Sequence, residues 1–268
     1  MKRLRTWLTL FFTAIAAVLL ITACNSGGTT SGASPSKSLI MATSADYPPF
    51  EFISTEGGSQ EIVGFDVDIA KYITEKTGYA LQIQNLDFNG LLPALQSKRA
   101  DFVMAGMTPT EERKKNVDFS DIYYEAKNTI VAKKGSGLTT GASLAGKKVG
   151  VQLSSIQEGV AKKIPNVTPV ALNRISELVQ ELKTGRIDAV IMEDTVAKGF
   201  TTSNPDLEFN VIPNEGEAGS AIAFPKGSPL ATEFNPVLKE MISSGKIQEL
   251  VTKWFGDESP AVTQTPAK

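Results

Sequence analysis

From residue 39 onward, short apolar runs alternate with longer stretches in which apolar residues recur every three or four positions. The short runs, which are typical of buried strands, fall at residues 39–42, 81–84, 101–105, 128–132, 147–151 and 188–192. Residues 64–66 are predicted to open a helix that Gly78 ends, and Leu91, Leu92 and Leu95 mark another. Strands that alternate with amphipathic helices predict parallel β-α-β units with helices on both faces of a sheet. The pattern therefore favours the α/β class.

One helix-to-strand junction is present twice. Residues 95–103 read LQSKRADFV and residues 182–190 read LKTGRIDAV, so each copy ends a helix and enters a buried strand through Arg-x-Asp. A single copy of this sequence is a common connection between a helix and a strand. Two copies with matched spacing favour two similarly wound lobes. The arginine and aspartate of each copy are expected to be structural, because they lie at the amino end of the strand, away from the end where ligands bind.

The first 23 residues have the pattern of a secretory signal. A basic start is followed by an apolar run over residues 7–21 and then by Ile-Thr-Ala-Cys, which resembles a lipobox ending at Cys24. A plain membrane anchor and a non-lipidated signal with a stray cysteine are the alternatives. The only cysteine of the chain lies where the motif requires it, so lipidation of Cys24 is the favoured interpretation. The expected location is the extracytoplasmic face of the cell membrane, with palmitate among the acyl chains.

The ends of the chain are too polar to form a core. Residues 24–38 are nearly all Gly, Ser, Thr and other small residues, which is typical of a flexible tether, and residues 258–268 form a similar tail. Residues 39–257 are left as the folded part.

Composition excludes several classes of chemistry. The chain has no histidine and one cysteine, which excludes Ser-His-Asp and Cys-His catalysis, histidine-ligated metals, cysteine clusters and intrachain disulfides. Removing residues 1–23 takes three of the 27 basic residues, so 24 remain against 29 acidic ones and the net charge is −5. A mildly acidic body has no field that would attract nucleic acid, and membrane attachment would depend on acyl chains. No metal or cofactor is expected.

A candidate anion site follows the strand at 101–105. Thr108 is predicted to cap a helix, with Pro109 in its first position and Glu111 completing a capping box. The small residues before it leave the backbone accessible, and Arg113 lies about one turn into the helix. Backbone N–H groups, a positive helix end and a guanidinium are suited to a carboxylate.

The second copy of the junction ends in the opposite charge. Glu193 and Asp194 follow the strand at 188–192, and residues 154–157 give another capping-box pattern after the strand at 147–151. Capping boxes are common in structural roles, and it is their position at strand ends that makes these residues candidates. One lobe is thus predicted to bind a carboxylate and the other to bind an ammonium.

Aromatic residues lie near the same strand ends. Tyr47 and Phe50 flank a diproline turn, and Phe88 precedes the helix at Leu91. Such residues are often core. Where Tyr47 and Phe88 flank a cleft, they form two walls suited to a guanidinium or an alkyl-ammonium, with Asp46 and Glu51 as nearby negative charges.

Several motifs occur in order along residues 39–257. They are Tyr47-Pro-Pro-Phe-Glu51, Gly64-Phe65-Asp66-Val-Asp68-Ile-Ala70, Ala105-Gly106-Met-Thr108-Pro-Thr-x-x-Arg113, Asp118-Phe-Ser-x-x-Tyr123-Tyr124 and Gly150-Val-Gln-x-Ser-x-x-Gln157. This pattern is similar to the family 3 extracellular solute-binding proteins, the polar amino-acid receptors of ABC importers.

The resemblance implies a two-lobed fold of the type II periplasmic-binding-protein kind. Each lobe would be a mixed, mostly parallel sheet flanked by helices, and two hinge strands would cross near residues 124–127 and 217–220. Lobe 1 is then expected at residues 39–124 plus 220–257, and lobe 2 at residues 125–219.

The resemblance also implies a set of ligand-binding residues, with Arg113 on the α-carboxylate and Glu193 on the α-ammonium. The full set is Ser44, Asp46, Tyr47, Glu51, Phe88, Ala105, Gly106, Met107, Thr108, Arg113, Ser154, Ile156, Gln157 and Glu193. Two positions depart from the family. Glu193 stands where an aspartate is usual, which leaves Asp194 as a possible substitute, and Ser44 stands where several cationic-ligand relatives have aspartate. The partner of a cationic side chain is then Asp46 or Glu51.

These observations predict a lipid-anchored, monomeric receptor that captures a basic L-amino acid by lobe closure and delivers it to an ABC permease. Arginine is the first candidate, followed by lysine, ornithine or histidine. The alternatives are a receptor for glutamine or another polar amino acid, an enzyme on the same fold such as a cyclohexadienyl-type dehydratase, and a surface protein that binds another protein.

Overall fold

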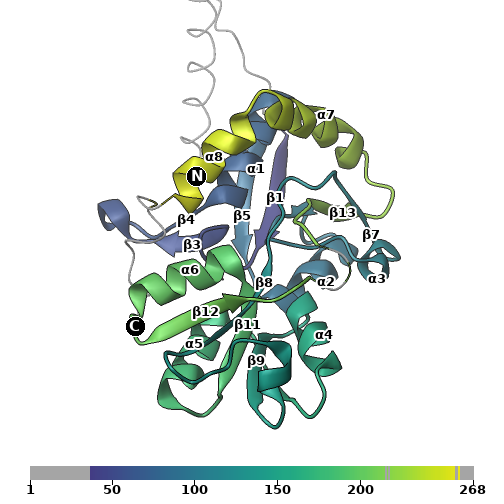
Figure 1. Cartoon of the computed structure of the whole chain (residues 1–268). Coiled ribbons are helices and arrows are strands. Elements are labelled where there is room, and N and C mark those ends of the chain that lie inside the picture. Colours follow the sequence, from purple (N-terminus) through teal and green to yellow (C-terminus); the bar gives the residue numbers. More distant parts are fainter. Residues whose placement is uncertain (1–36, 215, 217, 257–258, 260–268) are drawn as a thin grey trace, which may run out of the picture. The chain divides into compact units, whose positions relative to one another are not determined.

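The computed structural model describes residues 37–214, 216, 218–256 and 259. The predicted signal segment, Cys24 and nearly all of the predicted tether and tail lie outside these residues. Two five-stranded sheets organise the described part of the chain, and the helices pack around them (Figure 1).

The first sheet has the strand order β5-β1-β6-β13-β7. Its strands are β5 (Ala80–Asn85), β1 (Ser38–Thr43), β6 (Phe102–Val103), β13 (Ala223–Pro225) and β7 (Val117–Phe119). Strand β1 runs parallel to β5 and β6, whereas β13 runs antiparallel to β6 and β7. The predicted strand at 101–105 is therefore shorter than expected, although its position is right.

The second sheet repeats this arrangement with the order β10-β9-β11-β8-β12. Its strands are β10 (Thr168–Leu172), β9 (Lys148–Gln152), β11 (Ala189–Glu193), β8 (Asn128–Lys133) and β12 (Leu207–Val211). Strand β9 runs parallel to its neighbours β10 and β11, and β8 runs antiparallel to its neighbours β11 and β12. Each sheet thus contains one reversed strand, which confirms the predicted mixed, mostly parallel architecture.

The helices divide between the two sheets. Near the first sheet lie α1 (Phe65–Thr77), α2 (Leu91–Gln96), α3 (Glu111–Lys114), α7 (Leu230–Ser243) and α8 (Lys246–Phe255). The second sheet packs against α4 (Ile156–Lys163), α5 (Ile175–Thr184) and α6 (Asp194–Ser203). Helix α1 ends where the sequence predicts, because Gly78 takes the left-handed conformation at φ 78°.

A small antiparallel sheet was not anticipated. It consists of β2 (Asp46–Tyr47), β3 (Glu51–Ser54) and β4 (Glu61–Val63). The two prolines lie in the turn between β2 and β3, outside the hydrogen-bonded ladder, as a residue without an N–H requires. In this hairpin Tyr47 lies directly opposite Glu51.

The repeated Arg-x-Asp junction has the same role in both sheets. Asp101 accepts a hydrogen bond from the Ile40 N–H (2.7 Å), and Asp188 accepts one from the Lys148 N–H (2.8 Å). Each aspartate therefore joins the amino end of its strand to the neighbouring strand. The structural interpretation of these residues agrees with the geometry.

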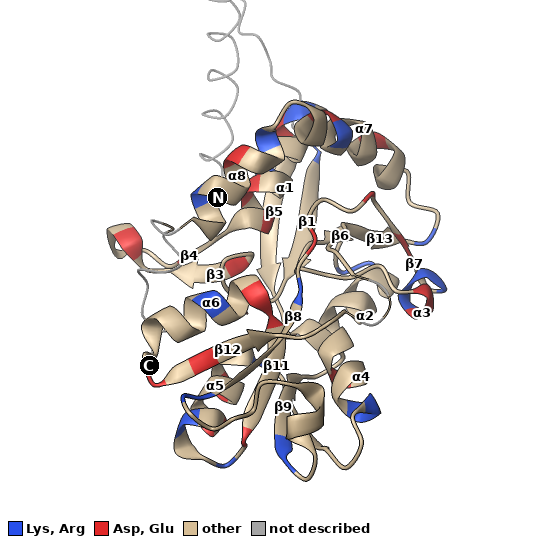
Figure 2. Ribbon diagram, in the orientation of Figure 1, with Lys and Arg blue, Asp and Glu red and all other residues tan. Residues whose placement is uncertain are grey.

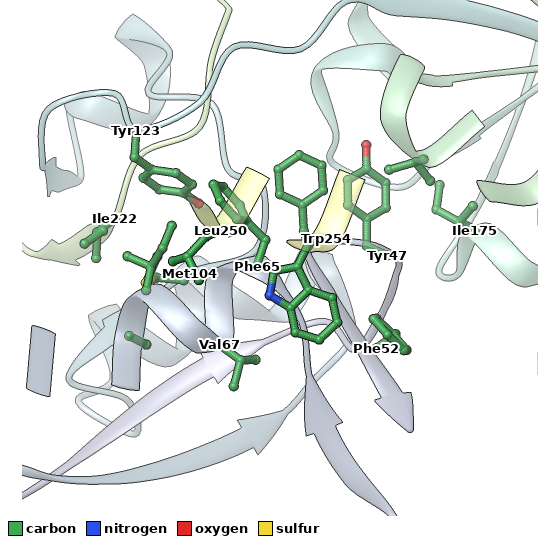
Figure 3. Packing of buried hydrophobic residues seen from close by; sticks show 14 of the residues in the cluster. Tyr47, Phe52, Phe65, Val67, Met104, Tyr123, Ile175, Ile222, Leu250 and Trp254 are labelled. Atoms are coloured by element: carbon green, nitrogen blue, oxygen red, sulfur yellow. The ribbon is translucent and has the colours of Figure 1, made fainter. Parts of the chain in front are cut away.

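The chain passes between the two sheets after β7 and again before β13. The two passages meet in an antiparallel bridge between Tyr124 and Ser220, whose N–H donates to the Tyr124 carbonyl at 2.7 Å. A buried apolar cluster runs through this junction and contains residues from both sheets; Figure 3 shows Tyr47 and Ile175 together at one end of it. The division into two moving lobes at the predicted boundaries stays a prediction.

Candidate functional site

A pocket opens at the carboxyl ends of the parallel strands, between the first and second sheets. It contains about 270 Å³ of empty space, part of it open to solvent. The lining residues are Tyr47, Phe88, Ala105, Gly106, Thr108, Arg113, Gln152, Ser155, Ile156, Gln157 and Glu193. Residues 47–113 of this set follow β1, β5 and β6, and the others end or follow β9 and β11. Strand ends of open α/β sheets are where such folds bind ligands.

Arg113 bridges the two sides of the pocket. Its guanidinium donates to the Thr108 carbonyl (2.9 Å) and to the Ser154 carbonyl (2.8 Å), and it lies 5.4 Å from the centre of the Phe88 ring. A guanidinium that lies over an aromatic ring and donates to two carbonyls is held in one orientation. The arrangement is suited to a carboxylate.

The helix that carries Arg113 begins later than predicted. Its N-cap is Thr110, whose hydroxyl accepts from the Arg113 N–H (3.2 Å), so the predicted capping box of Thr108 and Glu111 is wrong. The Thr108 carbonyl instead accepts from the Thr110 N–H in a turn, and α3 is only four residues long. Thr108 still lines the pocket with a buried side chain.

Gly106 is required by its backbone geometry. Its φ is +55°, and a Cβ at this position would lie 3.3 Å from the Tyr47 ring. Its N–H donates to Asp66 Oδ2 at 2.9 Å, so this backbone donor is already engaged. The sequence interpretation of free N–H groups at this turn does not apply to Gly106.

Glu193 provides the acidic end of the pocket. It is the last residue of β11 and the N-cap position of α6, and only 6% of its surface is exposed. Burial raises the pKa of its carboxyl group to about 8; the charges of Asp194 and Asp66 add to the rise, while Tyr47 and Arg113 oppose it. Its Oε2 has no hydrogen-bond partner among the described residues. A buried carboxyl group with one unsatisfied oxygen at a pocket wall is suited to a cation.

Asp194, the alternative acid, lies outside the pocket lining. Its carboxylate accepts from the N–H groups of Lys127 (3.2 Å) and Thr195 (2.9 Å). The structure therefore favours Glu193 over Asp194 as the acid that faces a ligand.

The start of α4 brings polar groups to the pocket from the second sheet. Its N-cap is Ser155, which accepts from the Glu158 N–H (3.3 Å), so the predicted pattern is displaced by one residue. Ser154 has φ +66° and reaches Arg113 only through its carbonyl. The Gln157 amide donates to Asn128 (3.0 Å).

Two lining residues, Gln152 and Ser155, are absent from the set predicted from the sequence. Gln152 is the last residue of β9, so the strand-end rule that pointed to Glu193 could have found it as well.

The aromatic residues separate into walls and core. Tyr47 and Phe88 line the pocket, whereas Phe50 is fully buried with its ring centre 5.7 Å from that of Tyr47. Met107, predicted at the site, also lies in the core rather than in the lining.

Ser44 and Asp46 do not line the pocket. The Ser44 hydroxyl donates to Asp46 Oδ1 (2.9 Å), and Asp46 Oδ2 accepts from the Ile175 N–H at the start of α5 (2.7 Å). Burial raises the pKa of Asp46 to about 6 despite these hydrogen bonds. Asp46 is thus occupied by the protein itself.

Glu51 lies behind the pocket in a buried acidic cluster. It is fully buried, and no N–H or hydroxyl group among the described residues donates to its carboxyl oxygens, which lie against the Asp66 carboxyl group. Burial, together with the charges of Asp66 and Asp46, holds its pKa well above the usual range. The pKa of Asp66 is raised to about 6 by burial, although Gly106 and Tyr123 donate to it. Figure 2 shows acidic segments in β3 and at the start of α6, where the two sheets face each other.

The described residues contain no group of three or more potential His, Cys, Asp or Glu ligands that could hold a metal ion. Within the same residues, no helix is long and apolar enough to cross a membrane.

The chain is similar in sequence to a known protein family and to proteins within it. Residues 39–257 match the model of the bacterial extracellular solute-binding proteins, family 3. The arginine-binding extracellular protein ArtP of Bacillus subtilis is 50% identical over 260 residues, which cover 95% of this chain and 100% of that protein.

Two solved structures share the fold. The amino-acid ABC transporter substrate-binding protein AbpA of Streptococcus pneumoniae, bound to L-arginine, is 36% identical with a TM-score of 0.79, and the match covers 85% of this chain and 97% of AbpA. An ancestral arginine-binding protein bound to glutamine is 42% identical with a TM-score of 0.74, covering 82% and 98% of the two chains. These relatives are binding proteins, in agreement with the expectation that the chain is not an enzyme.

Proposed function

The chain belongs to family 3 of the bacterial extracellular solute-binding proteins, and on that premise we propose that it captures a basic L-amino acid, arginine first, for an ABC importer. One observation carries the proposal. Arg113 and Glu193 line the same pocket but are held by different sheets. An α-amino acid has a carboxylate and an ammonium on one carbon, so a guanidinium and an acid on facing walls match both of its ends.

The α-carboxylate is assigned to Arg113. The Thr108 hydroxyl and the backbone at the start of α4, near Ile156, complete the carboxylate grip. Phe88 supports this assignment because its ring holds the guanidinium plane.

The α-ammonium is assigned to Glu193. This carboxyl group is buried, its Oε2 has no hydrogen-bond partner among the described residues, and burial favours its protonated form. An ammonium supplies the missing hydrogen-bond donors and the opposite charge. Such a pair is worth several kcal/mol when both partners are desolvated, typically about 2–5 kcal/mol on truncation of one side.

The ligand side chain is assigned to the space between Tyr47 and Phe88, with Glu51 as its charge partner. The alternative partner, Asp46, already accepts from Ile175. By contrast, no N–H or hydroxyl group among the described residues donates to Glu51, whose carboxyl group pairs only with that of Asp66. Glu51 also lies directly opposite Tyr47 in the β2–β3 hairpin. Two ring faces and a buried acid suit a planar, permanently charged guanidinium better than a compact ammonium.

Lobe closure follows from the same charges. Burying a zwitterion costs several kcal/mol per unpaired ion, so neither sheet alone can hold it well. Lobe 1 (residues 39–124 and 220–257) presents Arg113, and lobe 2 (residues 125–219) presents Glu193. The ligand binds the closed form more tightly than the open form, because only the closed form pairs both ends.

The extracytoplasmic location is that of the family. Attachment to the membrane through acyl chains on Cys24 is a further part of the proposal, supported by the basic and apolar start of the chain and by the single cysteine. The acidic body of the protein supplies no electrostatic membrane affinity of its own. The protein would then act as a monomeric receptor that is tethered to the membrane beside its permease.

Glutamine is the second candidate ligand. An ancestral arginine-binding protein at 42% identity was solved with glutamine bound, so this type of pocket admits a neutral polar side chain in that protein. The two ligands share the α-carbon groups and differ in the charge that Glu51 would meet.

A ligand panel by isothermal titration calorimetry tests the proposal. Arginine is expected to bind most tightly, then lysine, ornithine and histidine, with glutamine weaker. Glutamine binding tighter than arginine would transfer the assignment to the second candidate. Absence of binding by every common amino acid would overturn the proposal altogether.

A further inference from the structure

Each aromatic wall of the pocket is preceded by an aspartate. Asp46 comes directly before Tyr47, and Asp87 comes directly before Phe88. Neither aspartate lines the pocket. Both reach across to the second sheet instead.

The two aspartates bind one short segment of the second sheet, residues 173–175. Asp46 Oδ2 accepts from the Ile175 N–H at 2.7 Å. Asp87 accepts from the Arg174 guanidinium at 3.1 Å and from the Asn173 amide at 3.1 Å. All three residues of the segment therefore contact an aspartate next to a wall.

The same segment contacts the second-sheet side of the pocket. The Asn173 carbonyl accepts from the side-chain amide of Gln152 (3.2 Å), which lines the pocket. Ile175 lies in the same buried cluster as Tyr47 (Figure 3). Segment 173–175 is thus connected to both walls and to a lining residue of the opposite side.

From this juxtaposition we propose that Asp46, Asp87 and segment 173–175 form a closure latch, which holds the two lobes together without touching the ligand and slows ligand release. The proposal rests on the proposed function, since a latch acts only if the lobes open. Asp46 and Asp87 are positioning residues in this scheme.

The chemistry of the contacts supports a latch that forms on closure. Ile175 is the first residue of α5, so its N–H has no partner within the helix and needs an acceptor. A carboxylate at this end is also favoured by the helix dipole. In an open form water replaces Asp46 at that N–H, and the contact is remade when the lobes close.

The two contacts differ in expected strength. The Asp46 contact is partly buried and provides a missing helix cap. In the Asp87–Arg174 pair the side chains are 37% and 44% exposed. Exposed ion pairs contribute little to the free energy of a contact, because water and salt screen their charges. Asp46 is therefore expected to dominate the latch, with Asp87 secondary.

The test measures the dissociation rate of radiolabelled L-arginine from the purified protein during a chase with excess unlabelled arginine. Asp46→Ala is expected to dissociate about 10-fold faster, the scale of losing a helix cap. Asp46→Asn keeps a capping oxygen and should stay within about 3-fold of wild type. Arg174→Ala should release arginine at most about 3-fold faster.

Arg186→Ala is the matched control. Arg186 also forms an exposed ion pair, with Glu181 at 2.7 Å, but Glu181 lies in α5 and Arg186 just after it, so this pair does not reach across to the first sheet. Its release rate should equal that of wild type. Should Asp46→Ala fail to fold, Asp87→Ala provides the same comparison, with an expected increase of about 3-fold.

The melting temperature of the ligand-free variants separates a latch from a permanent contact. A latch predicts faster release with a ligand-free melting temperature close to that of Arg186→Ala. A lower melting temperature with unchanged release would show a permanent structural contact and overturn the latch, as would unchanged release in both aspartate variants. If wild type binds no amino acid, the proposed function fails and the latch with it; normal arginine binding with unchanged release rates refutes the latch alone.

Discussion

The two strands that begin with the Arg-x-Asp pattern are alike at their amino ends and different at their carboxyl ends. Asp101 and Asp188 make the same hydrogen bond to a neighbouring strand. Beyond the strands, β6 continues through a turn into the short helix that carries Arg113, whereas β11 leads directly into α6 with Glu193 at the boundary. A repeated frame thus builds two similar sheets, and the segments after the strands give them opposite charges.

The largest effect on ligand binding is expected from removing the guanidinium of Arg113, the cationic group of the pocket. Arg113→Ala should weaken arginine binding by at least about 100-fold, because it leaves a buried carboxylate without its partner. Calorimetry measures the affinity, and circular dichroism checks that the fold persists. Arg99→Ala, at the amino end of the same junction, is the control and should bind normally. Near wild-type affinity in Arg113→Ala would remove the functional difference between the two strand ends.

The acidic end should make binding depend on pH. The pKa of Glu193 is about 8 in the folded protein and 4.5 in a free side chain, so the folded state holds the extra proton between these values. The stability of the ligand-free protein therefore falls as pH rises through that window. Binding of an ammonium needs the ionised form, so arginine affinity should rise with pH by up to about 10-fold per unit and level off above about pH 8.

Titration calorimetry between pH 6 and pH 9 measures this dependence. In Glu193→Gln the affinity should be lower at every pH and nearly independent of it. A wild-type affinity that does not change over this range would contradict the assignment of Glu193 to the ligand ammonium.

A smaller effect should come from the acid behind the first-sheet wall. Glu51→Gln is expected to reduce the preference for arginine over glutamine by about 10-fold. A nearby guanidinium favours ionisation of the buried acid and so gains a counter-charge that glutamine does not need and that the variant cannot supply. Competition between the two amino acids measures the ratio directly. Equal losses for both ligands would place Glu51 outside the side-chain subsite.

The smallest effect is expected at the aromatic wall. Tyr47→Ala should weaken arginine by about 5-fold more than alanine, because only the longer, charged side chain reaches the ring face. The measurement compares the two affinities by calorimetry in variant and wild type. A loss that is the same for both amino acids would show a general packing role for Tyr47.

Much of the site could be predicted from strand ends. Arg113, Thr108, Glu193 and Tyr47 were placed at carboxyl ends of predicted strands, and the structure brings them to one pocket. The errors in capping were local: Thr108 and Ser154 were expected to cap helices, whereas Thr110 and Ser155 do so. Neighbouring hydroxyl residues have similar capping preferences, so the sequence does not distinguish adjacent candidates.

The amino-acid sequence by itself determined the alternation of strands and helices, the repeated junction and the opposite charges beyond it. These features depend on apolar spacing and on residues close together in the chain. Only the tertiary structure decided which groups already have partners. Asp46 caps a helix that begins 129 positions later, and Asp66 engages the Gly106 N–H 40 positions away. Contacts over such separations depend on how the two sheets pack against each other, and local sequence patterns carry no record of that packing.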